Sequence, residues 1–156
     1  MKVLITGCNG FIAKNLKLFL KERSDIDVFT FSKKNDISEL SRIVNEVDFI
    51  FHLAGVNRTE KREEFIEGNE KLTQELCKAI KITNRKIPII LSSSIQSKLD
   101  NPYGISKNNT ENIISNFSED FKTPVFIFRL PNVFGKWCKP NYNSVIATFC
   151  YNIIRD

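Results

Sequence analysis

The chain has 156 residues, a formal net charge of +5 at pH 7, and 42% hydrophobic and 26% charged residues. These values are typical of one globular domain with a sizeable core, and they exclude a disordered or fibrous chain. Charges of both signs are mixed along the sequence and no apolar run has transmembrane length, so we expect neither a nucleic-acid partner nor membrane insertion. Four cysteines without C-x-x-C spacing and a single histidine predict free thiols, a cytoplasmic location and no metal site.

The first predicted elements are a strand, a glycine-containing turn and a helix. Residues 2–5 form an apolar run typical of a buried parallel strand, and apolar residues recur at helical spacing over 11–20. The turn between them has the pattern G-x-x-G-x-x-A, from Gly7 through Gly10 to Ala13. Gly7 permits a tight turn, Gly10 permits close approach of the backbone to a pyrophosphate, and the helix N-terminus attracts phosphates. The pattern predicts a dinucleotide site, with a turn that binds no ligand as the alternative.

A second strand is predicted over 26–31, and Ser32, Lys33 and Lys34 follow it. In a dinucleotide fold the end of this strand meets the adenosine ribose. An acidic residue there binds the 2′-hydroxyl of NAD, whereas basic residues accommodate the 2′-phosphate of NADP. Because no acidic residue closes this strand, Lys33 and Lys34 favour NADPH. A solvated pair of lysines is the alternative.

Further along the chain, predicted strands and helices alternate. We expect strands over 48–53, 88–91 and 124–130, and helices over 38–47, 59–83, 103–117 and 145–154. This alternation predicts an α/β fold of the Rossmann type, a doubly wound parallel sheet with helices on both faces. The span after residue 31 is too short for a full extra strand–helix unit, so one strand should be stunted or absent. Gly68 is expected to interrupt the long helix.

Three residues carry the predicted chemistry. Tyr103 and Lys107 are four residues apart and therefore share one helix face. A neighbouring ammonium lowers the pKa of a phenol and makes proton transfer practical near neutral pH, and the lysine also suits ribose hydroxyls. Ser94 ends a strand at the carboxyl edge of the sheet, where its hydroxyl can bond to a substrate carbonyl. We predict that Ser94, Tyr103 and Lys107 are catalytic.

These motifs resemble the extended short-chain dehydrogenase/reductases over the whole chain. The resemblance rests on T-G-x-x-G-x-x-A at 6–13, H-L-A-G at 52–55, the serine–tyrosine–lysine set and R-L-P-N-V-F-G at 129–135. It implies that Asn69 is a structural asparagine near the active site and that Pro131 lies near the nicotinamide. The predicted cofactor-binding residues are Gly7, Asn9, Gly10, Phe11, Ile12, Ser32, Lys33, Lys34, Asp36, Leu53, Ala54, Gly55, Asn69, Tyr103, Lys107 and Pro131.

Segments 53–58, 92–96, 100–104 and 135–144 closely resemble a narrower group, the reductases of capsular-polysaccharide synthesis. In that group an NADPH-dependent reductase domain precedes a zinc-binding cupin domain that epimerises the sugar. The resemblance implies that residues 1–156 are the NADP-binding Rossmann domain with the start of the substrate-binding lobe, truncated from a longer protein that contains the rest of the lobe and a cupin. It also implies a homodimer and reduction of the C4 keto group of a UDP-2-acetamido-2,6-dideoxy-4-hexulose to a UDP-6-deoxytalosamine sugar.

The predicted substrate-binding residues are Arg58, Ser94, Asn132, Lys136 and Lys139. Asn132 lies inside the family element, whereas the three basic residues are candidates for the diphosphate or the sugar, with solvated loops as the alternative. The short spacing from Ser94 to Tyr103 predicts a short lid over the site. Residues 1–156 alone are expected to bind cofactor without necessarily catalysing the reaction.

Two other functions remain open. One is an NAD-dependent nucleotide-sugar epimerase or dehydratase. The absence of acidic residues in 94–96 disfavours a dehydratase, and the lysine pair disfavours tightly held NAD. The other is a non-catalytic dinucleotide-binding sensor or scaffold. Such proteins tend to lose the tyrosine or the lysine, and this chain has both.

Overall fold

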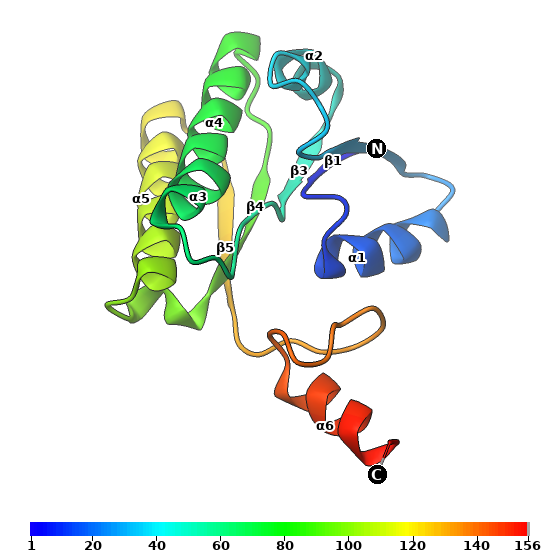
Figure 1. The fold of residues 1–156 in the computed structure, drawn as a ribbon. Helices are drawn as coiled ribbons and strands as arrows, with labels where there is room; N and C mark the ends of the chain where they lie inside the picture. The colour runs from blue at the N-terminus through cyan, green and yellow to red at the C-terminus, as the bar shows by residue number, and fades with distance from the viewer. Residues whose placement is uncertain (156) are drawn as a thin grey trace.

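A computed structural model describes residues 1–155, and it contains one five-stranded, fully parallel sheet (Figure 1). The strands run in the order β2-β1-β3-β4-β5, with bounds β1 (Lys2–Thr6), β2 (Asp27–Phe31), β3 (Phe49–His52), β4 (Ile89–Ser94) and β5 (Val125–Leu130). The order reverses between β1 and β3, the switch point at which open α/β sheets bind ligands. Within the described part of the chain no strand lies outside β2, so the strand expected to be stunted is absent.

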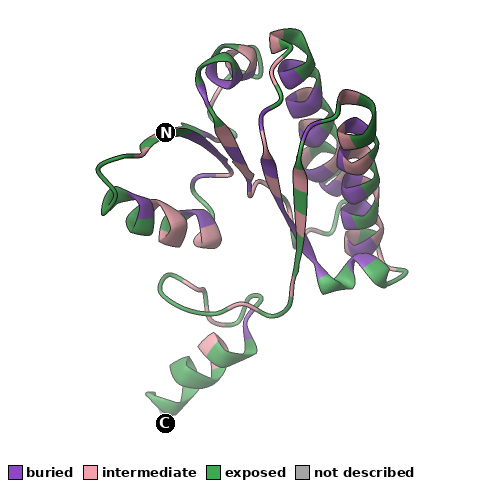
Figure 2. Cartoon of the chain, turned by 180° about the vertical axis from the view of Figure 1, so that it is seen from behind, coloured by how far each residue is buried: buried purple, intermediate pink, exposed green. Residues whose placement is uncertain are grey.

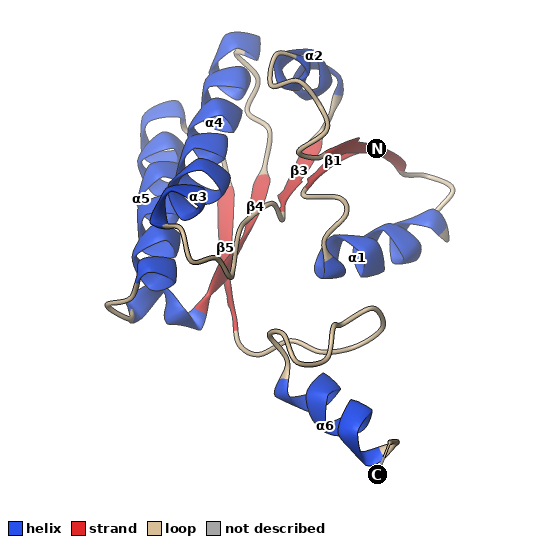
Figure 3. Cartoon of the chain, in the orientation of Figure 1, coloured by secondary structure: helices blue, strands red, loops and turns tan. Residues whose placement is uncertain are grey.

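Helices cover both faces of the sheet, and this confirms the predicted doubly wound fold (Figure 3). One face packs against α1 (Phe11–Lys21), and the other packs against α2 (Glu39–Glu46), α4 (Leu72–Thr83) and α5 (Pro102–Phe121). The side chains of β1 alternate between these faces, as a strand requires. Val3 and Ile5 pack on the α1 side, whereas Leu4 joins the core under α2, α4 and α5.

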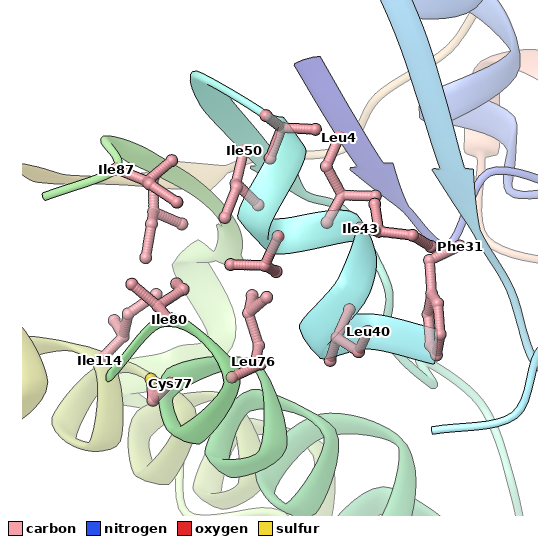
Figure 4. Packing of buried hydrophobic residues seen from close by; sticks show 14 of the residues in the cluster. Leu4, Phe31, Leu40, Ile43, Ile50, Leu76, Cys77, Ile80, Ile87 and Ile114 are labelled. Atoms are coloured by element: carbon pink, nitrogen blue, oxygen red, sulfur yellow. The ribbon is translucent and has the colours of Figure 1, made fainter. Parts of the chain in front are cut away.

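The larger of two apolar cores lies between the sheet and helices α2, α4 and α5 (Figure 4). Ile50 from β3, Leu76 and Ile80 from α4, and Ile114 from α5 are fully buried in it. Burying one such side chain contributes roughly 1.5–3 kcal/mol relative to leaving it exposed. This core therefore fixes α4 and α5 against the strands whose ends form the site.

The helix predicted over 59–83 is irregular in the structure. It starts at α3 (Arg62–Phe65), passes through a π-helical turn, η1 (Ile66–Lys71), and continues as α4. The interruption expected at Gly68 thus takes the form of an extra residue per turn. A Cβ at Gly68 would lie 2.5 Å from Val56 Cγ2, so only glycine permits this close approach. The turn brings Asn69 into the interior, where it is 2% exposed.

Helix α5 begins with a well-formed cap and runs past its predicted end. The Asn101 side chain accepts a hydrogen bond from the Gly104 amide at 2.8 Å, and Pro102 occupies the first turn, where its missing N–H costs nothing. The short 3₁₀ turn η2 (Ile95–Lys98) joins β4 to this cap. The helix extends to Phe121, whose ring stacks on Phe117 with centroids 5.4 Å apart.

Beyond β5 the chain continues through a long loop to α6 (Val145–Ile153), which extends away from the sheet (Figure 1). Seen from behind, α6 is exposed along most of its length, and none of its residues is buried (Figure 2). Phe126 and Phe128 of β5 are also half exposed. No helix within residues 1–155 is both long and apolar enough to cross a bilayer.

Candidate active site

The glycine-containing turn after β1 has the geometry that phosphate binding needs. Gly7 has φ +66°, and a Cβ there would lie 2.5 Å from the Ala54 Cα, so both conformation and space demand glycine. The Gly10 amide closes the turn on the Gly7 carbonyl at 2.8 Å. Within the described residues no side chain caps the first turn of α1, so its N–H groups remain available to an anion.

A cleft of about 690 Å³ opens between this turn, the end of β2 and η1. The Asn35 side chain accepts a hydrogen bond from the Ser32 amide at 2.9 Å and thereby shapes the turn that bears Lys33 and Lys34. The sequence-predicted cofactor residues that line this cleft are Gly7, Asn9, Gly10, Ser32, Lys33, Lys34, Leu53, Ala54 and Gly55. Predicted cofactor residues as far apart in sequence as Gly7 and Gly55 therefore line the same cleft.

Sequence reasoning missed an acidic wall of the same cleft, formed by Glu63, Glu64 and Glu67. Glu63 and Glu64 lie on α3 and Glu67 lies on η1, within the stretch predicted as one long helix over 59–83. Phe11 and Asp36 are among the predicted cofactor residues that do not line this cleft. Phe11 begins α1 with its ring near Gly135, and the Asp36 carboxylate accepts a hydrogen bond from the Ser38 amide at 2.8 Å before α2.

A second cleft, of about 500 Å³, lies where β4, β5 and α5 meet. Ser94, Tyr103 and Lys107 all line it, as the sequence predicted, and so do Ile12, Pro131 and Asn132. The two clefts share Leu53, Gly55 and Val56. They are therefore two ends of one groove over the switch point, of the kind that an extended ligand can occupy.

Lys107 is placed at the junction of the clefts. Its side chain is only 6% exposed, and its ammonium donates a hydrogen bond to the Ser92 carbonyl at 3.0 Å. A Cβ at Gly55 would lie 3.3 Å from Nζ, so the shared strip of backbone passes directly over the ammonium. Burial lowers the pKa of Lys107 to about 8, and the charge of Glu111 opposes this effect. The ammonium therefore remains mostly protonated at neutral pH.

Tyr103 is half-buried, and its ring contacts Phe65 with centroids 5.9 Å apart. Burial raises the pKa of Tyr103, while the Ser94 hydroxyl acts in the opposite direction. The expectation that Lys107 lowers this pKa is not met in the structure, where Ser94 is the group that does so. The Ser94 oxygen also accepts a hydrogen bond from the Gln96 amide at 3.2 Å, which sets its orientation at the end of β4.

A buried chain of hydrogen bonds runs from the glycine turn to η1 through His52. The Thr73 hydroxyl donates to the Asn69 carbonyl at 2.6 Å, so the same oxygen accepts from His52 Nε2 at 2.9 Å. This assigns the imidazole proton to Nε2 and makes Nδ1 the acceptor of the Thr6 hydroxyl at 2.7 Å. Burial and the nearby Lys107 lower the pKa of His52 to about 3, so the ring is neutral.

Asn69 lies behind the clefts and positions their walls. Its side chain accepts from the Val56 amide at 2.8 Å and donates to the Val56 carbonyl at 3.1 Å and to Ser106 Oγ at 2.9 Å. Ser106 in turn donates to the Tyr103 carbonyl at 2.8 Å. The structural role predicted for Asn69 fits this geometry, but its placement among residues that touch the cofactor does not, since it lines neither cleft.

The three basic residues predicted to bind substrate do not line either cleft in this structure. The Arg58 guanidinium donates to the Tyr142 carbonyl at 3.3 Å and lies over the Tyr142 ring. The Lys136 ammonium lies 4.8 Å from the centre of the Trp137 ring. Asn132, by contrast, lines the second cleft, and its side-chain amide donates to the Asn143 carbonyl. The residues of this cleft that the sequence analysis did not predict are Val56, Asn57, Ser92, Ser93, Ile95, Gln96, Leu130, Val133 and Asn143.

The fold and the two clefts are those of a dinucleotide-dependent enzyme, and comparison with known proteins identifies the family. Residues 3–156 match the model of the NAD dependent epimerase/dehydratase family, so the chain belongs to this family. This confirms the resemblance to extended short-chain dehydrogenase/reductases.

Two relatives refine the placement. The UDP-2-acetamido-2,6-beta-L-arabino-hexul-4-ose reductase of Pseudomonas aeruginosa PA103 is 54% identical over 156 residues, which are 100% of this chain and 42% of that protein. The crystal structure of the capsular polysaccharide assembling protein CapF from Staphylococcus aureus has a TM-score of 0.84 and 44% identity, covering 99% of this chain and 41% of CapF. The chain therefore spans about two fifths of the length of these relatives.

A third comparison bears on the fold alone. The UDP-glucuronic acid 4-epimerase of Bacillus cereus, solved with UDP-glucuronic acid and NAD, has a TM-score of 0.85 at 20% identity. It covers 99% of this chain and 63% of that protein.

Proposed function

We propose that this chain is the cofactor-binding and catalytic part of an NADPH-dependent nucleotide-sugar reductase. Its substrate would be a UDP-2-acetamido-2,6-dideoxy-4-hexulose, reduced at C4 to a UDP-6-deoxytalosamine sugar for a surface polysaccharide. The observation that carries this proposal is the meeting of Ser94, Tyr103 and Lys107 in a cleft that continues, through Leu53, Gly55 and Val56, into the cleft of the glycine turn. The 54% identity to a reductase of such a sugar supports the substrate class.

The residues of the first cleft fit a dinucleotide. Close packing of Gly7 on Ala54 leaves room for a diphosphate beside the uncapped first turn of α1. Exposed Lys33 and Lys34, at the end of β2, suit a 2′-phosphate. The chemistry that the bound cofactor supplies is hydride transfer to the keto carbon.

The residues of the second cleft would handle the proton. The Tyr103 hydroxyl donates a proton to the carbonyl oxygen as that oxygen becomes an alkoxide, and the Ser94 hydroxyl donates a hydrogen bond to the same oxygen. Lys107 holds ribose hydroxyls with the ammonium hydrogens that Ser92 does not use.

Cofactor preference is the first test of this proposal. NADPH and NADH binding are measured by titration at equal salt, for the wild-type chain and for Lys33→Glu/Lys34→Glu. We expect tighter binding of NADPH, with the preference lost or reversed in the double variant because two carboxylates then face the 2′-phosphate. The control is Lys21→Glu/Lys98→Glu, which makes the same charge change at exposed sites outside both clefts.

The alternatives predict other results. Equal binding, or tighter binding of NADH, would favour the NAD-dependent epimerase. Failure to bind either nucleotide would contradict the reductase and favour the alternative that the glycine turn binds no ligand.

We also propose, from the resemblance to the family, that the rest of the substrate lobe and a cupin domain complete the protein. A homodimer would form through the helix that bears Tyr103, packed in a four-helix interface. Gel filtration with light scattering of the full-length protein tests this, and a monomer would contradict it.

A further inference from the structure

Glu111 is a buried carboxylate that the proposed chemistry leaves without a role. It lies on α5 four residues after Lys107 and eight after Tyr103, so the three side chains share one stripe of the helix. Glu111 is 4% exposed. Burying a carboxylate costs free energy unless it is paired and hydrogen-bonded, so the partners of Glu111 indicate its role in the site.

The partners of Glu111 come from two other elements of the site. The Ser93 hydroxyl of β4 donates to Oε1. The Arg129 guanidinium of β5 donates to the carboxylate through Nε at 3.1 Å and through Nη2 at 2.7 Å. Such a two-pronged pair restricts orientation as well as distance.

These partners are next to the functional residues of their strands. Ser93 directly precedes Ser94, and Arg129 lies two residues before Pro131 and three before Asn132. One carboxylate therefore joins the helix that carries Tyr103 and Lys107 to both strand ends that complete the second cleft. Misplacement of a catalytic group by about 1 Å can reduce the rate about 10²-fold, so this contact bears on catalysis.

We propose that Glu111 is a positioning residue of the reductase: it holds the ends of β4 and β5 against α5 and places a negative charge behind the Lys107 ammonium. This inference rests on the proposed function, because it assigns Glu111 a task in proton donation at that same cleft. Arg129 then contributes to the site by holding Glu111 in place, and this role explains why an arginine begins the segment 129–135.

The charge has a consequence for Lys107 that can be followed by pH. The groups around the ammonium are Glu111 on α5, the Ser92 carbonyl on β4 and the neutral His52 on β3. Burial lowers the pKa of Lys107 to about 8 and Glu111 acts against this. Without the Glu111 charge, the pKa of Lys107 falls further and Arg129 is left as an uncompensated cation, so the ammonium loses its proton at a lower pH.

The decisive variant is Glu111→Gln in the full-length protein, with kcat measured from pH 6 to 9. We expect the alkaline fall in kcat to begin at lower pH than in the wild type, with at least a threefold greater loss at pH 8 relative to pH 6. The matched control is Glu119→Gln on the exposed face of the same helix, which should leave the profile unchanged. A folded Glu111→Gln protein with the wild-type profile would overturn the inference.

Glu111→Asp keeps the proposal testable if the glutamine variant does not fold. It retains the charge but withdraws the carboxylate by one methylene from Ser93 and Arg129, so kcat should fall while the alkaline limb stays in place. Unchanged kcat in this variant would contradict the positioning role.

A readout without turnover separates this inference from the proposed function. The Lys107 side chain can be titrated by NMR in protein with 13C-labelled lysine, with its signal identified by its loss in Lys107→Met. A lower Lys107 pKa in Glu111→Gln supports the inference even if the wild type proves not to reduce the sugar, and an unchanged pKa opposes it even if reduction is confirmed.

Discussion

At the scale of single residues, the site combines groups that must be charged with groups that must not be. Lys107 stays protonated although it is buried, because Glu111 and the Ser92 carbonyl face it. His52 lies near the same ammonium and stays neutral, because its burial and the positive charge of Lys107 both disfavour a protonated ring. The same interior thus holds two basic side chains in opposite states, according to the partners that the fold gives each of them.

The state of His52 predicts a pH dependence of stability. Its pKa is about 3 in the folded chain against an ordinary value of 6.5, so between these values the unfolded chain binds more protons. Stability from this group begins to fall as the pH drops through 6.5, and the slope approaches about 1.4 kcal/mol per pH unit below that value. Urea unfolding at pH 6.5, 6.0 and 5.5 measures the slope, and His52→Gln should lose it.

The tautomer can be checked directly, because this histidine is the single one in the chain. Nitrogen NMR of histidine-labelled protein should show a neutral ring with its proton on Nε2 from pH 7.5 to 5.5. Thr73→Val leaves the Nε2 proton buried without an acceptor and should cost about 1–3 kcal/mol. A ring that titrates near pH 6.5 in the folded protein would refute the network.

At the scale of elements, the structure depends on α4 and α5 being held firmly against β3 and β4. Leu76 of α4 is fully buried, whereas Ile82 of the same helix is 75% exposed. We expect Leu76→Ala to lower the free energy of unfolding by about 2–5 kcal/mol, and Ile82→Ala to change it by no more than about 0.5 kcal/mol. Chemical denaturation of the two variants provides the comparison, and equal losses would contradict the packing described for α4.

Element by element, the sequence predicted what local patterns encode and missed what tertiary contacts impose. Strand, glycine turn and helix at the N-terminus follow from residue types and spacing, and so does the shared face of Tyr103 and Lys107. The π-helical turn at Ile66–Lys71 does not, since Gly68 fits Val56 only after the chain has folded. The ion pair of Glu111 with Arg129 likewise joins α5 to β5, and no local sequence pattern predicts that contact. The predictions for Arg58 and Lys136 rest on charge alone, and in the structure Arg58 lies over the Tyr142 ring and Lys136 over the Trp137 ring.

At the scale of the whole molecule, the groove is one channel with two separable ends. The lysine pair lies only in the cleft of the glycine turn, and Tyr103 lies only in the cleft of Ser94. Leu53, Gly55 and Val56 form the part that both ends share. A binding defect and a chemical defect should therefore be obtainable independently of one another.

Tyr103→Phe tests that separation in the full-length protein. The variant removes the hydroxyl that would donate the proton but keeps the ring that packs on Phe65, so kcat should fall about 10²–10⁴-fold with little change in the Kd for NADPH. Lys33→Glu/Lys34→Glu should show the reverse, weaker NADPH binding with kcat at saturating cofactor largely kept. Tyr151→Phe on α6, remote from both clefts, is the matched control.

A Tyr103→Phe enzyme with near wild-type kcat would mean that another group protonates the oxygen. Parallel losses of binding and kcat in both variants would mean that the two clefts act as a single site.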